Sequence, residues 1–211
     1  MIININKPAG WTSFDVVKKV RSIIKEKKVG HAGTLDPFAE GVLVLGTGPD
    51  TKKLTDISTS NKTYLAELTL GKATDTQDRD GKISVVEIVP KLTKETIATV
   101  LTGFDGSQEQ IPPMYSAKHV NGQRLYKLAR KNKIVERKPV NISIEQISLL
   151  DYTEPVITFN VTCSKGTYVR VLGADIAAKL GTVGHLTALT RTSVGSYHIA
   201  DATTIEELSN S

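Results

Sequence analysis

The stretch GHAGTLDPFAEGVLVLG (30–46) holds one carboxylate, Asp36, in a glycine-containing loop directly before the apolar run VLVL. Four consecutive aliphatic residues are typical of a buried strand. Pro37 fixes its own φ angle and biases Asp36 toward an extended conformation. A rigid loop at the edge of a core can hold a reactive group still, but Asp before Pro is also common in ordinary turns. The stretch therefore predicts a buried strand and leaves the role of Asp36 open.

Strands and helices alternate irregularly along the rest of the chain. Thr12 and Ser13 are candidate caps for a helix whose apolar stripe contains Val16, Val17 and Val20. Residues 63–71 and 82–89 have the composition of two strands joined by the polar connection KATDTQDRDG. The pattern predicts an α+β fold with a mixed, mostly antiparallel sheet flanked by helices and loops.

The bulk composition is that of a soluble globular protein. A chain of 211 residues with 39% apolar and 23% charged residues suits a single domain, which we expect to span 1–211. It contains no apolar stretch of the ~20 residues that would span a membrane. Cys163 is the single cysteine, so an internal disulfide and a cysteine-based zinc site are excluded, and the four histidines lack metal-binding spacing. We expect a cytoplasmic protein without a metal.

Positive charge is concentrated in two segments. The net charge is +5, but 18–28 carries six basic residues and one acidic residue, and 115–139 carries eight and one. The remainder of the chain sums to −7. A solvated helix face explains one such run equally well, but two runs, the second with Tyr115, Tyr126 and His119, favour a polyanion with exposed bases.

Two motifs resemble other sites only weakly. TDTQDRDGKISVVE places Asp78, Asp80 and Gly81 as a calcium loop would, but the first ligand is Thr76 and the flanks predict strands rather than helices. A polar hairpin connection is the better interpretation. Asp36 and Glu40 could form a glycosidase pair only if their carboxylates converged, which the sequence does not establish.

Five segments resemble the TruB family of tRNA pseudouridine synthases in order and spacing, and together they cover most of the chain. They are NKPAGWTSFDVV (6–17), VGHAGTLDPFAEGVLVLGTGPDTK (29–52), KTYLAELTLGKATDTQDRDG (62–81), QIPPMYSAKHVNGQRLYKLAR (110–130) and CSKGTYVRVLGADIAAKLG (163–181). The resemblance implies a pseudouridine synthase fold and isomerisation of the T-loop uridine (position 55) of tRNA to pseudouridine. It implies no cofactor and no metal.

The resemblance assigns roles to individual residues. Asp36 of GTLDP takes the place of the catalytic aspartate, Tyr64 that of the tyrosine that stacks on the target base, and Arg170 that of an arginine expected to pair with Asp36. His31 matches a histidine that assists extrusion of the nucleotide, and Leu189 a leucine of the uracil pocket. Further substrate contacts are expected from Tyr168, Lys118, Arg124 and Lys127.

The expected partner is the T-arm stem-loop of tRNA, clasped by the basic insertion at 115–139. We expect a monomer with no obligate protein partner and no membrane association. Bacterial family members usually continue into a small C-terminal PUA domain, and we expect this chain to lack that domain, either naturally or by truncation. A non-catalytic tRNA-binding or tRNA-folding module remains the alternative, and a nucleoside hydrolase is a third class. Whether Asp36 acts as nucleophile or as base stays open.

Overall fold

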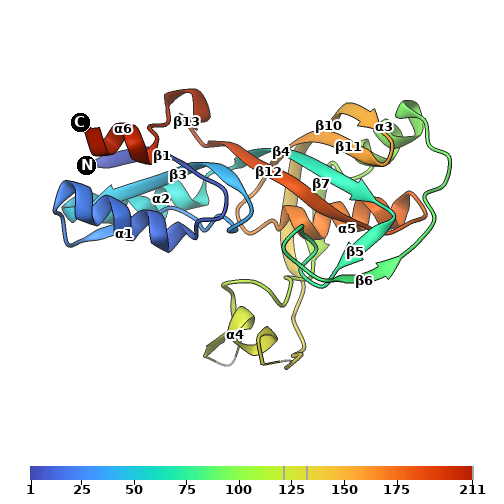
Figure 1. The fold of residues 1–211 in the computed structure, drawn as a ribbon, viewed down its shortest axis with the longest axis horizontal. Helices are drawn as coiled ribbons and strands as arrows, with labels where there is room; N and C mark the ends of the chain where they lie inside the picture. The colour runs from blue at the N-terminus through green and yellow to red at the C-terminus, as the bar shows by residue number, and fades with distance from the viewer. Residues whose placement is uncertain (121, 132, 211) are drawn as a thin grey trace. The chain divides into compact units, whose positions relative to one another are not determined.

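The computed structural model describes residues 1–120, 122–131 and 133–210, which form two compact units (Figure 1). Unit 1 comprises 1–65 and 188–211, and unit 2 comprises 66–187. The chain passes between the units inside two strands, β4 (Lys62–Leu70) and β12 (Gly184–Val194), and the single catalytic domain stays a prediction. The described chain contains no helix long and apolar enough to cross a membrane.

The sheet of unit 1 is mixed. Its strand order is β1-β3-β12-β4, in which β1 pairs antiparallel with β3 and β12 pairs parallel with β3. The short strands β2 and β13 add to β3 and β12. The elements wholly in unit 1 are β1 (Ile2–Lys7), α1 (Ser13–Ile24), β2 (Val29–His31), β3 (Glu40–Thr47), the 3-10 helix η1 (Gly48–Lys53), α2 (Leu54–Thr59), β13 (Tyr197–His198), η2 (Ile199–Asp201) and α6 (Ile205–Asn210).

The predicted buried strand VLVL lies in β3 and separates two apolar clusters. Leu43 and Leu45 pack with Val16, Val17 and Val20 of α1 on one face of the sheet. Val42 and Val44 pack on the other face, in a cluster that includes a residue of α2. The alternation of side chains along a strand explains why four consecutive aliphatic residues are all buried.

The sheet of unit 2 is antiparallel at its outer strands. Its order is β12-β4-β11-β10-β7, with β10 paired antiparallel to both β11 and β7. Helix α3 packs against β10 and α5. The elements wholly in unit 2 are β5 (Lys72–Thr74), β6 (Ile83–Val86), α3 (Lys94–Thr102), β7 (Gly106–Gln110), β8 (His119–Val120), β9 (Gln123–Arg124), α4 (Leu125–Ala129), β10 (Val140–Thr153), β11 (Val156–Cys163) and α5 (Val169–Lys179).

The α+β fold with a largely antiparallel sheet is confirmed, with one local correction. The polar connection predicted between 63–71 and 82–89 contains a further strand, β5, which pairs with β6 as a separate two-stranded sheet. Gly71, with a φ of +85°, turns the chain out of β4 just before β5. The flanks of the calcium-like motif are therefore strands, as expected.

Candidate active site and nucleic-acid interface

Asp36 lies in the loop that joins β2 to β3, which we call the Asp36 loop (residues 32–39). Its side chain is partly exposed, whereas its neighbours Leu35 and Phe38 are buried. The Ala39 amide donates to the Asp36 carbonyl at 3.2 Å, which closes a turn around Pro37. The loop therefore presents its carboxylate at the edge of the unit 1 core.

Two residues from the N-terminal segment hold this loop. Ser13 Oγ accepts from the Leu35 amide at 2.9 Å and donates to the Leu35 carbonyl at 3.1 Å. Lys7 is fully buried, and its Nζ donates to the carbonyls of Pro8, Trp11 and Pro37 at 2.9, 2.7 and 3.3 Å. Ser13 thus serves the loop, and Thr12 alone caps α1, by a reciprocal pair of bonds with Asp15.

Arg191 of β12 holds the loop from the other side. Its side chain is 1% exposed, and its Nε donates to the Val42 carbonyl at 2.7 Å. Nη1 and Nη2 donate to the carbonyls of Thr34 and Gly33 at 3.3 and 3.2 Å. A buried guanidinium that satisfies three backbone carbonyls fixes a loop of little regular structure.

Gly41 is required where β3 pairs with β12. Its φ is +104°, and a Cβ added there would lie 2.9 Å from the Arg191 backbone nitrogen and closer still to the Arg191 carbonyl oxygen. Only glycine fits this conformation and this approach. The register Gly41–Arg191 therefore brings the arginine alongside the Asp36 loop.

The buried cations alter the electrostatics of unit 1. Burial lowers the pKa of Lys7 to about 8, with Asp36 acting to raise that pKa and Arg191 to lower it. The pKa of His31 is lowered by burial and, less, by the charge of Arg191. The His31 imidazole is accordingly held in its neutral form at neutral pH.

The other predicted site residues of unit 1 lie on strands. Tyr64 is 8% exposed on the buried face of β4, which alternates regularly between buried and exposed positions. Leu189 is buried on β12, two residues before Arg191 and on the same face of the strand. His31 is the last residue of β2 and directly precedes the Asp36 loop.

Arg170 lies in the first turn of α5 in unit 2, as the sequence predicts. Its side chain is 2% exposed. Nη1 donates to the Thr76 carbonyl at 2.7 Å and Nη2 to the Tyr115 carbonyl at 2.8 Å, and Nε lies 3.6 Å from Asp78 Oδ2. The guanidinium is thus anchored within its own unit, and its predicted pairing with Asp36 stays a prediction.

Asp78 is a buried carboxylate to which the sequence assigned no catalytic or binding role. It is 6% exposed, and its Oδ1 accepts from the Thr76 hydroxyl at 2.5 Å and from the Asp80 amide at 3.1 Å. Its place in the calcium-like motif is the one signal that could have drawn attention to it. In the structure this carboxylate faces the Arg170 guanidinium.

Gln110 is a second residue that sequence reasoning missed. It is 4% exposed at the end of β7, and its side-chain amide makes two bonds to the backbone of Tyr168. Oε1 accepts from the Tyr168 amide at 2.8 Å, and Nε2 donates to the Tyr168 carbonyl at 3.2 Å. Tyr168 is the residue before α5, so Gln110 fixes the start of the helix that carries Arg170.

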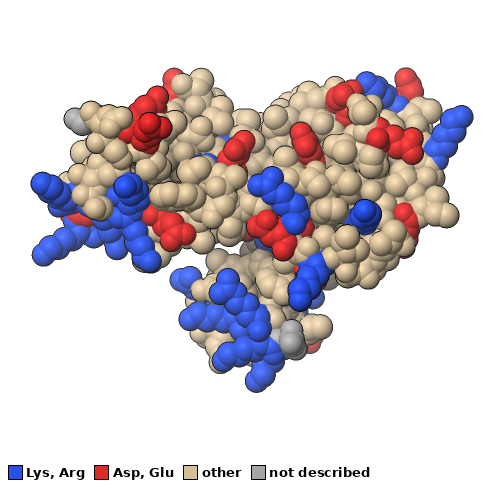
Figure 2. Space-filling view, in the orientation of Figure 1, with Lys and Arg blue, Asp and Glu red and all other residues tan. Residues whose placement is uncertain are grey.

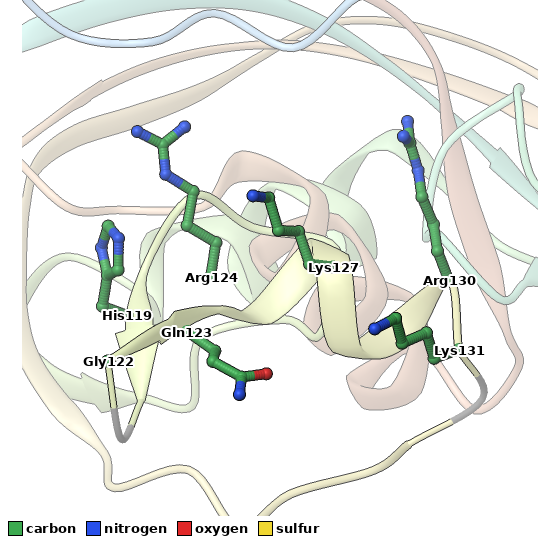
Figure 3. Close-up of a pocket in the computed structure, with 7 residues that line it drawn as sticks. All are labelled: His119, Gly122, Gln123, Arg124, Lys127, Arg130 and Lys131. Atoms are coloured by element: carbon green, nitrogen blue, oxygen red, sulfur yellow. The ribbon is translucent and has the colours of Figure 1, made fainter.

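A basic cleft of about 540 Å³ lies around α4 in unit 2 (Figure 3). The side chains of Arg124, Lys127 and Arg130 point to the same side in Figure 3. Of the predicted contacts, Arg124 and Lys127 line this basic cleft, whereas Lys118 does not. The lining residues are His119, Gly122, Gln123, Arg124, Lys127, Arg130 and Lys131.

The described residues also bear on the metal and thiol chemistry that the sequence raises. They contain no group of three or more His, Cys, Asp or Glu side chains placed to hold a metal ion. Cys163 is a buried cysteine outside any disulfide at the end of β11, as expected for a structural cysteine. Asp36, His31, Tyr64 and Leu189 belong to unit 1, and Arg170, Tyr168, Lys118, Arg124 and Lys127 belong to unit 2.

Comparisons with known proteins give one consistent answer. A family model described as TruB family pseudouridylate synthase (N terminal domain) matches residues 21–169. A tRNA pseudouridine synthase B of Clostridium kluyveri is 49% identical to this chain, and the match covers 98% of this chain and 71% of the relative. A tRNA pseudouridine synthase B of Dehalococcoides mccartyi is 45% identical, and the match covers 98% of this chain and 69% of the relative.

Solved structures agree. A chain in the crystal structure of a Cbf5-Nop10-Gar1 complex superposes with a TM-score of 0.79 at 26% identity. The match covers 99% of this chain, which spans 53% of that one. A chain of an H/ACA RNP bound to a substrate RNA containing 2′-deoxyuridine gives a TM-score of 0.73 at 26% identity. That match covers 99% of this chain and 52% of the other chain. The chain therefore belongs to the TruB family of pseudouridylate synthases.

Proposed function

We propose that this chain isomerises the T-loop uridine of tRNA to pseudouridine, with Asp36 as the catalytic carboxylate. The observation that carries the proposal is the Asp36 loop, which carries one partly exposed aspartate and whose backbone is held by Ser13, Lys7 and Arg191. Such fixed placement suits a group that must meet a reacting centre. The curated relatives are named tRNA pseudouridine synthase B, which supports the same reaction.

The reaction breaks the N-glycosidic bond of uridine and joins the same ribose carbon to C5 of the uracil. The proton on C5 is removed and the former glycosidic nitrogen gains one, so nothing is oxidised and no group leaves. One ionised carboxylate can serve this sequence, either as a nucleophile on the ribose or as a proton acceptor. The pocket must also retain the detached base while it turns.

The remaining residues have proposed supporting roles. Tyr64 offers an aromatic face to the target base, and the buried Leu189 supplies apolar surface for the uracil. A neutral His31 suits insertion into the stack that the base leaves, because no charge is then desolvated. Arg170 is the proposed guanidinium partner of the carboxylate, which would favour the ionised form.

The basic cleft is the proposed binding surface for the phosphate backbone of the T-arm. Its four cationic side chains suit phosphates, and Tyr126 packs under Arg130 with 5.5 Å between guanidinium carbon and ring centroid. An H/ACA RNP neighbour is described as bound to a substrate RNA, which supports an RNA substrate. A cytoplasmic, monomeric protein without an obligate protein partner stays a prediction.

The test is pseudouridine mapping on an unmodified tRNA transcript with wild-type protein, Asp36→Ala and Asp36→Asn. We expect pseudouridine at the T-loop uridine with wild type and none with either variant. A wild type that binds the transcript but forms no pseudouridine would establish the RNA-binding module instead. Release of free uracil from the transcript would establish the hydrolase.

A further inference from the structure

Helix α1 and the segment that follows it carry a cluster of exposed lysines that the proposed active site does not use. We call Lys18, Lys19, Lys25, Lys27 and Lys28 the α1 basic surface; all five are exposed. Figure 2 shows Lys and Arg side chains gathered over α1, as they are over α4. Arg21 of the same helix is only partly exposed, and it donates to the Val29 carbonyl at 3.0 Å, so it belongs to the local structure.

Acidic side chains compensate little of the charge of the α1 basic surface: Asp15 of the same helix interacts electrostatically with Lys18. In the described part of the chain, no carboxylate lies within ion-pair distance of its five ammonium groups. Glu26, the acid between them, accepts from the Lys28 backbone amide at 2.9 Å. By contrast, Lys53 lies 2.8 Å from Asp50. Five exposed like charges without an ion pair among the described residues are better placed on a surface that meets an anion.

The α1 basic surface begins beside the Asp36 loop. Ser13, the first residue of α1, bonds to Leu35 of that loop. Phe14 follows, 52% exposed, with Lys18 Nζ 4.9 Å from its ring centroid. Positions 14 and 18 share one helix face because they are four residues apart. Lys25 caps the C-terminal end of the helix, about 16 Å along the axis from position 14. Lys18 and Lys19 therefore lie on the helix that begins at the Asp36 loop, and the other three lysines follow its C-terminal end.

We propose that the α1 basic surface binds the phosphodiester backbone of the RNA substrate, as a second contact besides the basic cleft of α4. The proposal rests on the proposed function to the extent that the substrate is RNA. Lysine suits this partner because its ammonium is a compact point charge that contacts phosphate without a fixed geometry. The surface needs no pocket, since phosphate contacts position the strand rather than read its bases.

Two other anionic partners fit the surface less well. A membrane-binding helix turns its apolar face toward the lipid, but the apolar face of α1, with Val16, Val17 and Val20, is buried against β1 and β3. An acidic protein partner would need several exposed aromatic or aliphatic anchors among the charges, and the exposed large apolar residue of α1 is Phe14 alone. RNA requires neither feature.

The experiment compares two triple variants in binding to an unmodified tRNA transcript over a range of salt concentrations. The variant Lys18→Gln/Lys19→Gln/Lys25→Gln removes three charges from the α1 basic surface. The matched control, Lys52→Gln/Lys72→Gln/Lys91→Gln, removes three exposed charges outside both the α1 basic surface and the basic cleft. Glutamine keeps a helix propensity close to that of lysine, and circular dichroism verifies the fold of both variants.

We expect the α1 variant to raise the Kd for tRNA about tenfold at 0.15 M salt and to reduce the slope of log K against log salt by about 2. The control is expected to keep the wild-type slope. An unchanged Kd for the α1 variant, or equal changes in both variants, would overturn the proposal. The proposal would also be overturned if the α1 variant lost binding to phosphatidylserine vesicles but bound tRNA as wild type does. Pseudouridine formation by wild type is measured separately, so failure of the proposed function is distinguishable.

Discussion

The Asp36 loop of unit 1 and the basic cleft of unit 2 both depend on cations, but they use them in opposite ways. Lys7 and Arg191 are buried, and their side-chain nitrogens donate to backbone carbonyls. Arg124 and Lys127 are exposed and line open space. The difference indicates that a buried cation here fixes a backbone, whereas an exposed cation is available for a ligand.

The largest expected effect comes from removing a buried cation. Arg191→Met leaves the carbonyls of Val42, Thr34 and Gly33 without their donor, so we expect the free energy of unfolding to fall by about 3 kcal/mol. The Asp36 loop loses its anchor, and the single-turnover rate at saturating protein should fall about 100-fold. Urea unfolding and rapid-quench assays measure the two effects.

The matched control is Arg130→Met in unit 2, where the arginine is exposed. Its free energy of unfolding should stay within about 0.5 kcal/mol of wild type. If Arg191→Met and Arg130→Met lowered the free energy of unfolding equally, the proposed difference between buried and exposed cations would be wrong.

Removing exposed cations should change binding rather than stability. For Arg124→Gln/Lys127→Gln/Arg130→Gln we expect a Kd for tRNA about tenfold higher and a shallower salt dependence, because phosphate contacts are lost. Fluorescence anisotropy against a labelled T-arm hairpin measures both quantities. The Lys52, Lys72 and Lys91 triple variant serves as the charge-matched control; a Kd that rises equally there would contradict assignment of the basic cleft to RNA.

The smallest effect is a pH dependence of stability that comes from Lys7. Its pKa in the folded chain is about 8, below the ordinary value of 10.5, so between these values the unfolded chain holds more protons. Stability should therefore rise with pH, by about 1 kcal/mol between pH 8 and pH 9 from this group. Urea unfolding of wild type and Lys7→Met as a function of pH isolates the contribution.

Lys53→Met is the control for this measurement, since Asp50 raises the pKa of Lys53 and the sign of its contribution is opposite. That variant should retain the rise between pH 8 and pH 9. If Lys7→Met retains the same rise as wild type, burial of the Lys7 ammonium does not perturb its ionisation.

Local patterns in the sequence predicted the elements well. The strand after the Asp36 loop, the helix that follows Thr12 and the position of Arg170 in the first turn of a helix are all confirmed. Each depends on residues close in sequence, such as a capping box or an aliphatic run. Strand β5 was missed because three residues are too few to show a period.

The supports of the candidate site could not be predicted in the same way. Arg191 occupies a strand position whose polarity suggests an exposed side chain. Its burial depends on contacts distant in sequence: its strand pairs with Gly41, and its guanidinium donates to the carbonyls of Val42, Thr34 and Gly33. Ser13 is a residue type that commonly caps helices, but its hydroxyl accepts from the amide of Leu35, 22 residues away. Asp78 and Gln110 likewise act on residues far along the chain. Such roles depend on tertiary contacts, which cannot be predicted from a local sequence pattern.

The most direct test measures the single-turnover rate of pseudouridine formation and the Kd for the same tRNA in Asp36→Asn and in the Arg124, Lys127 and Arg130 triple variant. Our account predicts that Asp36→Asn forms no pseudouridine while its Kd stays within about twofold of wild type, because the loop and the exposed cations are intact. The triple variant should bind weakly but retain the rate at saturating protein. Pseudouridine formation by Asp36→Asn at the wild-type rate would contradict the account.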